Sequence, residues 1–298
     1  MAFACIDIGS NTVRLLVAEP ARDGFKEVLA QRSFARLARG RKRDQAIGRA
    51  KIAEVADVVA TQVRLADELG ARALRAVATA AIRQAPDGDE LVEAIRTHAG
   101  VDVAVLTGEE EARLAFVGAT RTLGHEPHGE VAVVDVGGGS SELALGTVAA
   151  GVRWSESFRV GSGFLADAYL RCDPPSAAEL NRVRAHAAGV FEGLSLPTPQ
   201  LAVAVGGSAA SLRRLVGAVL EYETLERGIR LLASLPVQAV ARRFELDPER
   251  VRLLPAGILI LEAVSDRLGA PLQIGRGGLR EGVVLEMIAA ADGGAGPA

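Results

Sequence analysis

The sequence predicts an α/β protein built from two domains of similar topology that face each other across a ligand-binding cleft. Two observations lead to this fold class. The order of strands and helices over roughly the first 120 residues starts again in the second half, and each half opens with an apolar strand, an aspartate and a glycine turn. Ligands of paired α/β domains usually lie in the cleft between them.

The first half, residues 1–123, combines period-two apolar runs with longer helical runs. Glycines at 70 and 100 occupy favoured positions just after helix ends. The predicted elements are strands at 2–7, 12–19 and 25–34, a helix at 46–69, a strand at 72–78, a helix from 87 to 100, a strand at 101–106 and a helix at 108–122.

The second half, residues 124–298, repeats this order with additional helices. Its last helix, 279–290, is a candidate to pack back on the first domain. The predicted elements are strands at 131–136, 140–146 and 150–158, a helix at 176–193, a strand at 201–205, a helix at 208–218, inserted helices, a long helix at 247–268, a strand at 271–275 and the last helix.

The composition limits the class of protein. Hydrophobic residues make up 49% and charged residues 24% of the chain, a balance typical of globular proteins. A formal net charge of −3 gives the whole chain no attraction to nucleic acid or membranes. The two cysteines form no C-x-x-C pair, and neither a signal peptide nor a membrane-spanning run is apparent. We therefore expect a cytoplasmic protein.

Both halves begin with the same kind of turn, which reads Asp7-Ile-Gly-Ser-Asn-Thr12 in the first and Asp135-Val-Gly-Gly-Gly-Ser-Ser141 in the second. Glycines let the backbone turn tightly, and successive amides then form a concavity that binds anions. An aspartate at the strand end suits Mg²⁺, which prefers a few carboxylates together with phosphate oxygens. A pair of ordinary glycine hairpins is the alternative, and the match between the halves disfavours it. The predicted phosphate-binding residues are Gly9, Ser10, Asn11, Thr12, Gly137, Gly138, Gly139, Ser140 and Ser141.

Two further glycine clusters stand at helix starts. Gly206, Gly207 and Ser208 lie between a strand and a helix, where helix amides can bind a phosphate. The second cluster, 275–282, opens the last helix. A close contact between a helix and a strand is the alternative for each cluster.

Three consecutive glutamates begin the helix that ends the first half. Thr107 and Glu110 have the spacing of a capping box. Glu109 and Glu110 both reach Arg113 at helical spacing, whereas Glu111 shares the apolar face of the helix and has no cation there. Because burying a lone carboxylate is costly, Glu111 is predicted to contact water, metal and phosphate as a catalytic base. The alternative is that all three glutamates interact with the helix dipole.

Together, these motifs resemble the exopolyphosphatase and guanosine pentaphosphate phosphohydrolase (Ppx/GppA) family, in its short two-domain form. The resemblance spans nearly the whole chain. It rests on the two aspartate turns, 78–83, 108–114, Gly206-Gly-Ser208, Leu254-Pro-Ala-Gly257 and Arg276-Gly-Gly-Leu-Arg-Glu-Gly282.

The resemblance implies two actin-like (ribonuclease H-like) domains and Glu111 as the catalytic base. It also implies that Asp135 and Glu142 position metal and water, that Asp7 lies at the first phosphate loop as a further metal ligand, and that Arg83 contacts phosphate. The implied cofactor is Mg²⁺, with Mn²⁺ as an alternative, and the implied assembly is a homodimer.

A basic strip between residues 31 and 51 bears on the substrate. It contains Arg32, Arg49 and Lys51, together with the candidates for guiding a polyanion, which are Arg36, Arg39, Arg41, Lys42 and Arg43. Such a strip favours inorganic polyphosphate over guanosine pentaphosphate, although a solvated surface is the alternative. The sequence thus predicts an exopolyphosphatase that releases terminal orthophosphate. The alternatives are a guanosine pentaphosphate 5′-phosphohydrolase, a non-catalytic alarmone sensor, an actin-like ATPase or sugar kinase, and a scaffold that only keeps the fold.

Overall fold

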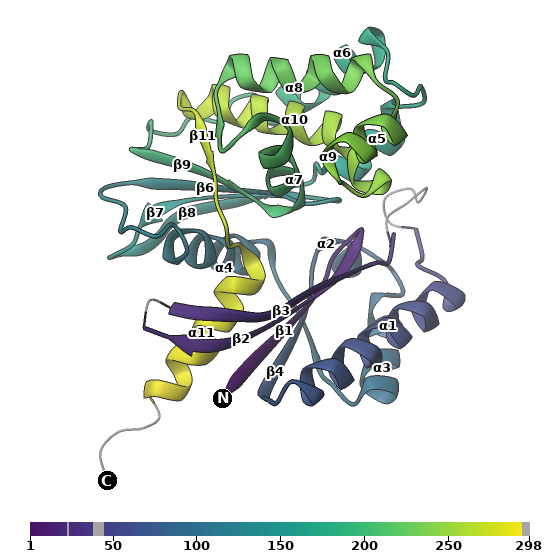
Figure 1. The fold of residues 1–298 in the computed structure, drawn as a ribbon, viewed down its shortest axis with the longest axis vertical. Helices are drawn as coiled ribbons and strands as arrows, with labels where there is room; N and C mark the ends of the chain where they lie inside the picture. The colour runs from purple at the N-terminus through teal and green to yellow at the C-terminus, as the bar shows by residue number, and fades with distance from the viewer. Residues whose placement is uncertain (23, 38–44, 294–298) are drawn as a thin grey trace. The chain divides into compact units, whose positions relative to one another are not determined.

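A computed structural model describes residues 1–22, 24–37 and 45–293 (Figure 1). The chain divides into two compact units. Unit 1 comprises Met1–Thr122 and Gly277–Ala298, and unit 2 comprises Leu123–Arg276. The structure therefore places the last helix, α11 (Leu279–Gly293), in unit 1 with the N-terminal third of the chain.

Unit 1 is built on a five-stranded sheet with the order β3-β2-β1-β4-β5. The first three strands form an antiparallel meander, and β1 is parallel to β4. The strands are β1 (Ala2–Ile8), β2 (Thr12–Ala21), β3 (Gly24–Phe34), β4 (Ala71–Ala78) and β5 (Val103–Val105). The helices besides α11 are α1 (Arg49–Glu68), α2 (Ala80–Arg83), α3 (Gly88–Ala99) and α4 (Gly108–Arg121).

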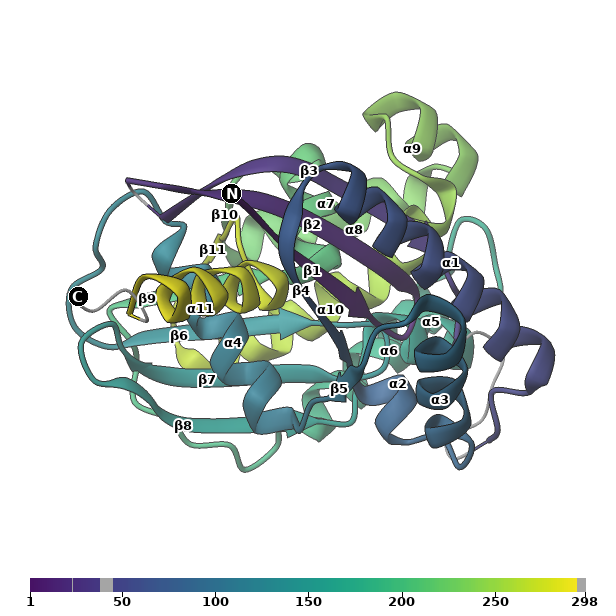
Figure 2. The ribbon, with the colours of Figure 1, turned by 90° about the horizontal axis from the view of Figure 1, so that it is seen from below.

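Strand β1 is buried along its whole length because helices cover both faces of the sheet. Ile6 and Ile8 belong to one apolar cluster with residues of α1 and α3. Phe3 and Cys5 point the other way and pack with residues of α4 and α11. Successive strand residues face opposite sides, so the uninterrupted apolar run of β1 is what a two-sided core requires. Figure 2 shows α4 and α11 crossing each other.

Unit 2 repeats this sheet with one added strand, in the order β10-β11-β9-β6-β7-β8. The strands are β6 (Val131–Val136), β7 (Ser141–Thr147), β8 (Gly151–Phe158), β9 (Leu201–Val205), β10 (Val219–Leu220) and β11 (Leu272–Ile274). The helices are α5 (Ser162–Tyr169), α6 (Ala177–Val190), α7 (Gly206–Val216), α8 (Tyr222–Ser234), α9 (Val237–Phe244) and α10 (Pro248–Leu268). Two units with matching sheet order confirm the predicted repeated α/β fold.

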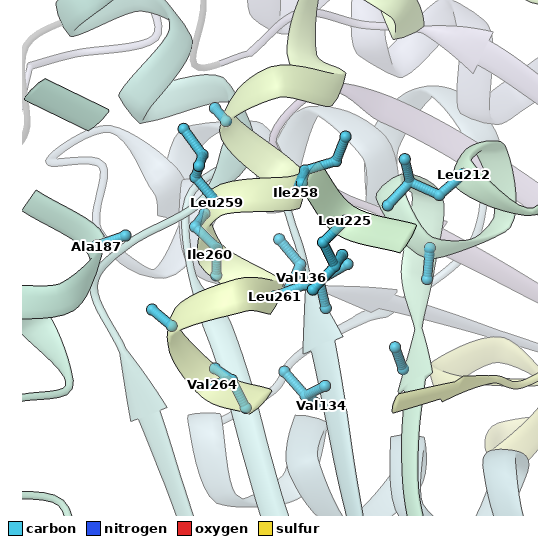
Figure 3. Close-up of a cluster of buried hydrophobic side chains, with 14 of the residues drawn as sticks. Val134, Val136, Ala187, Leu212, Leu225, Ile258, Leu259, Ile260, Leu261 and Val264 are labelled. Carbon is cyan, nitrogen blue, oxygen red and sulfur yellow. The ribbon is translucent and has the colours of Figure 1, made fainter. Parts of the chain in front are cut away.

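The core of unit 2 forms around α10, whose residues Ile258 to Leu261 are all buried (Figure 3). Their aliphatic side chains pack with Val134 and Val136 of β6 and with Leu212 of α7. A helix surrounded by other elements buries residues on every side, which explains why the run around Leu253 to Leu261 reads as continuously apolar. Among the residues with described structure, no helix is both long and apolar enough to cross a membrane.

Most predicted elements agree with the structure to within a few residues, and the exceptions are short. The sequence patterns do not predict α2, α5 or β10. In addition, α7 begins at Gly206 rather than at the predicted 208, so the glycine pair forms the first turn of the helix itself. Elements of two to eight residues carry too little periodicity to be recognised, and tertiary contacts stabilise them instead.

Candidate active site

The hairpin of unit 1 joins β1 to β2. The Gly9 amide donates to the Thr12 carbonyl at 2.9 Å, which closes the turn. The segment after β3 supports it, since the amides of Ala35 and Arg36 both donate to the Asn11 carbonyl, at 3.0 and 2.9 Å. The Asn11 side-chain nitrogen is buried and has no hydrogen-bond partner within the described part of the chain. A buried donor without a partner is costly, so this nitrogen is suited to an oxygen ligand.

Asp7, at the end of β1, is 1% exposed and is paired with Arg14 of β2. The two residues are cross-strand neighbours, and the Arg14 Nε lies 2.9 Å from Asp7 Oδ2. The other carboxylate oxygen, Oδ1, is buried and lacks a hydrogen-bond partner among residues 1–22, 24–37 and 45–293. Asp7 therefore combines one neutralised oxygen with one oxygen that can accept a metal or a donor.

The hairpin of unit 2 joins β6 to β7 and closes in the same way. The Gly137 amide donates to the Ser140 carbonyl at 3.0 Å. The start of α5 supports this loop, because the amides of Ser162 and Phe164 donate to the carbonyls of Gly137 and Gly138, at 2.9 and 3.0 Å. The predicted ligand Ser141 instead uses its hydroxyl inside the protein, where it donates to the Val160 carbonyl at 2.7 Å.

A cross-strand row of polar residues lies beside the unit 2 hairpin. Asp135 of β6 is the register partner of Glu142 of β7, and Glu142 is the register partner of Ser157 of β8. Figure 2 shows these three strands side by side. Glu142 is 4% exposed, and its Oε1 accepts a hydrogen bond of 2.8 Å from the Ser157 hydroxyl. The sheet register thus brings together the predicted pair Asp135 and Glu142.

The third glycine loop packs directly against Asp135. Gly206 has a φ of +86°, and a Cβ atom there would lie 2.2 Å from Asp135 Oδ1. A Cβ at Gly207 would lie 2.2 Å from the Nη1 of Arg250, a buried arginine of α10. Gly206 is therefore favoured both by its positive φ and by the close approach of Asp135. Ser208 is 1% exposed, and its hydroxyl has no hydrogen-bond partner within the described segments.

Glu111, the predicted base, lies in the first turn of α4 and is 6% exposed. The prediction that it has no cation is wrong, since Arg83 of α2 donates to its Oε1. Arg83 also donates to the Leu106 carbonyl, just before α4. Counting helical neighbours could not find this partner, because it comes from another element 28 positions away.

The other two glutamates of α4 have local roles. Thr107 and Glu110 form the predicted capping box, with the Thr107 amide 2.8 Å from Glu110 Oε2. This backbone hydrogen bond holds the pKa of Glu110 below its usual value. Arg113 forms an ion pair with Glu286 of α11, and its charge also contributes to lowering the pKa of Glu110, as its helical spacing predicts. The glycine cluster at 275–282 likewise serves packing, since a Cβ at Gly282 would lie 2.0 Å from the Leu114 carbonyl oxygen.

Four of the five candidates for guiding a polyanion, Arg39, Arg41, Lys42 and Arg43, lie outside the described residues. The fifth, Arg36, has its guanidinium 6.0 Å from the centre of the Phe34 ring. Arg32 lies over the same ring at 5.1 Å. Lys51 is paired with Glu54 at 2.6 Å, so part of the positive charge of the strip is locally neutralised.

The predicted metal ligands Asp7, Asp135 and Glu142 are distributed over both units, and their carboxylates fit a hard cation such as Mg²⁺. Two observations support the fit, namely the buried unpartnered Oδ1 of Asp7 and the adjacent register positions of Asp135 and Glu142. In the part of the chain that the structure describes, no three His, Cys, Asp or Glu residues form a group able to hold a metal.

Two units with matching sheet order, each opening with an aspartate hairpin, define a duplicated α/β fold. The model of the Ppx/GppA phosphatase family matches residues 16–291. The chain therefore belongs to this family and is a phosphatase, a hydrolase.

Named relatives support the assignment. The chain is 29% identical to exopolyphosphatase 1 of Mycobacterium tuberculosis, and the match covers 97% of this chain and 88% of that protein. It is also 29% identical to exopolyphosphatase 1 of Mycobacterium leprae, with 97% of this chain and 90% of that protein covered. Among solved structures, the Aquifex aeolicus member of the Ppx/GppA family is 28% identical with a TM-score of 0.82, covering 98% of this chain and 99% of that one. An exopolyphosphatase from Cytophaga hutchinsonii shows the shared fold, with a TM-score of 0.87 at 21% identity over 97% and 98% of the two chains.

Proposed function

We propose that this protein is an exopolyphosphatase that releases terminal orthophosphate from inorganic polyphosphate. The observation that carries the proposal is the hairpin that both units share. The Gly9 amide donates to the Thr12 carbonyl after Asp7, and the Gly137 amide donates to the Ser140 carbonyl at the corresponding positions after Asp135. The names of the mycobacterial relatives support polyphosphate as the substrate. Phosphoryl transfer depends mostly on positioning and charge stabilisation, which such loops supply.

Phosphate oxygens are proposed to bind at three places in the chain. The first two are the hairpins that follow Asp7 and Asp135, where amides and the Asn11 side chain would donate hydrogen bonds. The third is the start of α7, where the helix N-terminus and the buried Ser208 hydroxyl would interact with an anion. At all three places the glycines let the backbone approach closely.

Glu111 is proposed to accept a proton from the attacking water. A bond forms between the water oxygen and the terminal phosphorus, the bridging P–O bond breaks, and the shortened polyphosphate leaves with the bridging oxygen. Arg83 fixes the orientation of the Glu111 carboxylate through Oε1, and its second hydrogen bond to Leu106 anchors the guanidinium at the start of α4. A positioned base contributes about 10²–10⁴-fold in rate.

Asp135 and Glu142 of unit 2 and Asp7 of unit 1 are the proposed ligands for Mg²⁺ or Mn²⁺. When bound, such a cation reduces the negative charge of the phosphoryl groups and favours departure of the leaving group. We further propose that the protein acts in the cytoplasm as a homodimer, a state that light scattering of the purified protein would establish.

The test compares phosphate release from short polyphosphate, long polyphosphate and guanosine pentaphosphate, each with Mg²⁺ and with a chelator. We expect Mg²⁺-dependent release that is fastest with polyphosphate and that weakens steeply as salt increases, because the basic strip would bind a polyanion. Faster turnover of guanosine pentaphosphate would identify the alternative phosphohydrolase. Binding without release would identify a sensor, and a phosphorylated acceptor would identify a kinase.

A further inference from the structure

Three neighbouring strands of unit 2 place a hydroxyl next to a pair of carboxylates. Asp135 of β6 is the register partner of Glu142 of β7, which is in turn the register partner of Ser157 of β8. The three strands lie side by side (Figure 2). Cross-strand register partners have side chains on the same face of a sheet, a few ångströms apart. Two like charges in such positions repel each other, so the geometry of the row depends on how the two carboxylates are oriented.

Ser157 is placed to supply that orientation. Its hydroxyl lies 2.8 Å from Glu142 Oε1 and donates to it. Glu142 is buried, whereas Ser157 is only half-buried, so the serine approaches the carboxylate from the strand at the outer edge of the sheet. A hydrogen bond to one oxygen fixes the rotation of the carboxylate and thereby the direction of its other oxygen.

From this row we infer that Ser157 is a positioning residue for the reaction, which acts through Glu142 and orients it, together with Asp135, toward a divalent cation. The inference rests on the proposed function, because it assumes that these carboxylates hold the metal. Hydrogen bonds from outside the ligand sphere commonly change metal affinity or activity by about 10–100-fold when removed. We place the loss of one neutral donor near the lower end of that range.

The strand provides a matched control. Ser155 lies on β8 two residues before Ser157, so it projects from the same face of the sheet, but its register partner is Ala144 rather than a carboxylate. Ser155→Ala removes the same hydroxyl from the same strand and should leave metal binding unchanged. Ser157→Thr keeps the hydroxyl and should restore most of what Ser157→Ala loses.

The experiment measures Mn²⁺ binding by electron paramagnetic resonance on the full chain, in parallel with Mg²⁺-dependent phosphate release. For Ser157→Ala we expect about 10-fold weaker Mn²⁺ binding and about 10-fold lower kcat with little change in KM. The double variant Ser157→Ala/Glu142→Gln should bind Mn²⁺ no more weakly than Glu142→Gln alone, because Ser157 acts only through Glu142.

The outcomes separate this inference from the proposed function. If Ser157→Ala binds Mn²⁺ and turns over like Ser155→Ala while the wild type is active, the positioning role is refuted and the proposed activity stands. Additive losses in the double variant would also refute it. If the wild type neither binds Mn²⁺ nor releases phosphate, the proposed function itself fails. Equal melting temperatures for the two serine variants would show that a loss in binding is not a loss of folding.

Discussion

The two hairpins of this protein close with the same backbone hydrogen bond, but the residue opposite the aspartate differs in charge. In unit 1 the cross-strand neighbour of Asp7 is Arg14, and in unit 2 the cross-strand neighbour of Asp135 is Glu142. Each neighbour stands seven residues after its aspartate, so the two positions correspond. In unit 1 the aspartate is therefore paired with a cationic side chain of the neighbouring strand, whereas in unit 2 its cross-strand neighbour is a second carboxylate. A repeated fold can thus acquire two roles through one side chain.

The backbone hydrogen bonds that the two hairpin loops accept from neighbouring segments differ as well. The unit 1 loop receives two amides on the single carbonyl of Asn11. The unit 2 loop is supported over two carbonyls by the start of α5, and a Cβ at Gly161 would lie only 2.4 Å from the Gly138 carbonyl carbon. The unit 2 loop is thus held at two of its carbonyls, whereas the unit 1 loop is held at one.

The largest expected effect lies in neither hairpin. Glu111→Gln should lower kcat by about 10²–10⁴-fold without unfolding the protein, since it removes the proposed proton acceptor and keeps the shape of the side chain. Glu109→Gln on the same helical turn is the control and should remain active. Retention of full turnover in Glu111→Gln would leave the hairpins as the only candidates for the chemistry.

Gly206→Ala tests how closely the unit 2 hairpin is packed. The new methyl group would meet Asp135 Oδ1, and displacement of that carboxylate should cost about 10²-fold in kcat/KM. Gly217→Ala, at the residue that follows α7, is the matched control, because its φ of +100° imposes similar backbone strain and nothing lies within 4 Å of the new Cβ. Equal losses in both variants would attribute the effect to the backbone alone.

A pair of substitutions at the corresponding positions tests the charge difference directly. Glu142→Gln should raise the Mg²⁺ concentration for half-maximal activity by about 10–100-fold, whereas Arg14→Gln should change it much less. Titrations of activity and of Mn²⁺ binding would measure both. An equal or larger metal effect from Arg14→Gln would show that the unit 1 hairpin is the metal site and would reverse the comparison.

The capping boxes of the two units extend the comparison to stability. Glu179, at the start of α6, accepts hydrogen bonds from the backbone amides of Ser176, Arg171 and Cys172, which hold its pKa at about 2. A carboxylate whose pKa is lowered by folding stabilises the fold above its ordinary pKa, and this contribution is lost as the pH falls from about 4.5 toward 2.

Glu179→Gln should therefore lower the free energy of unfolding at pH 7 by about 1–2 kcal/mol, with a difference from wild type that shrinks at pH 3. Urea unfolding at the two pH values would measure it. Glu110→Gln in the α4 box, where Thr107 supplies the backbone amide, should cost less. A pH-independent difference would contradict the electrostatic explanation.

Several features of the site were predictable because they depend on local sequence. Strands with period-two apolar residues, the glycine turns after Asp7 and Asp135, and the capping box at Thr107 all follow from short-range rules, and the structure contains each of them. The partners of the acidic residues were not predictable in the same way. Glu111 accepts a hydrogen bond from Arg83, and Glu142 accepts one from Ser157. Both donors belong to other elements, so neither could be found by counting positions along one helix or strand.

The sequence alone determined the family, the repeated α/β order and the two aspartate hairpins, because these depend on residue types at fixed short spacings. Only the tertiary structure decided which charges meet. The strand register places Arg14 opposite Asp7 and Glu142 opposite Asp135. The position of α2 allows Arg83 to pair with Glu111. Contacts between distant segments depend on how sheets and helices pack, and that packing determines which carboxylate meets a cationic side chain and which meets another carboxylate.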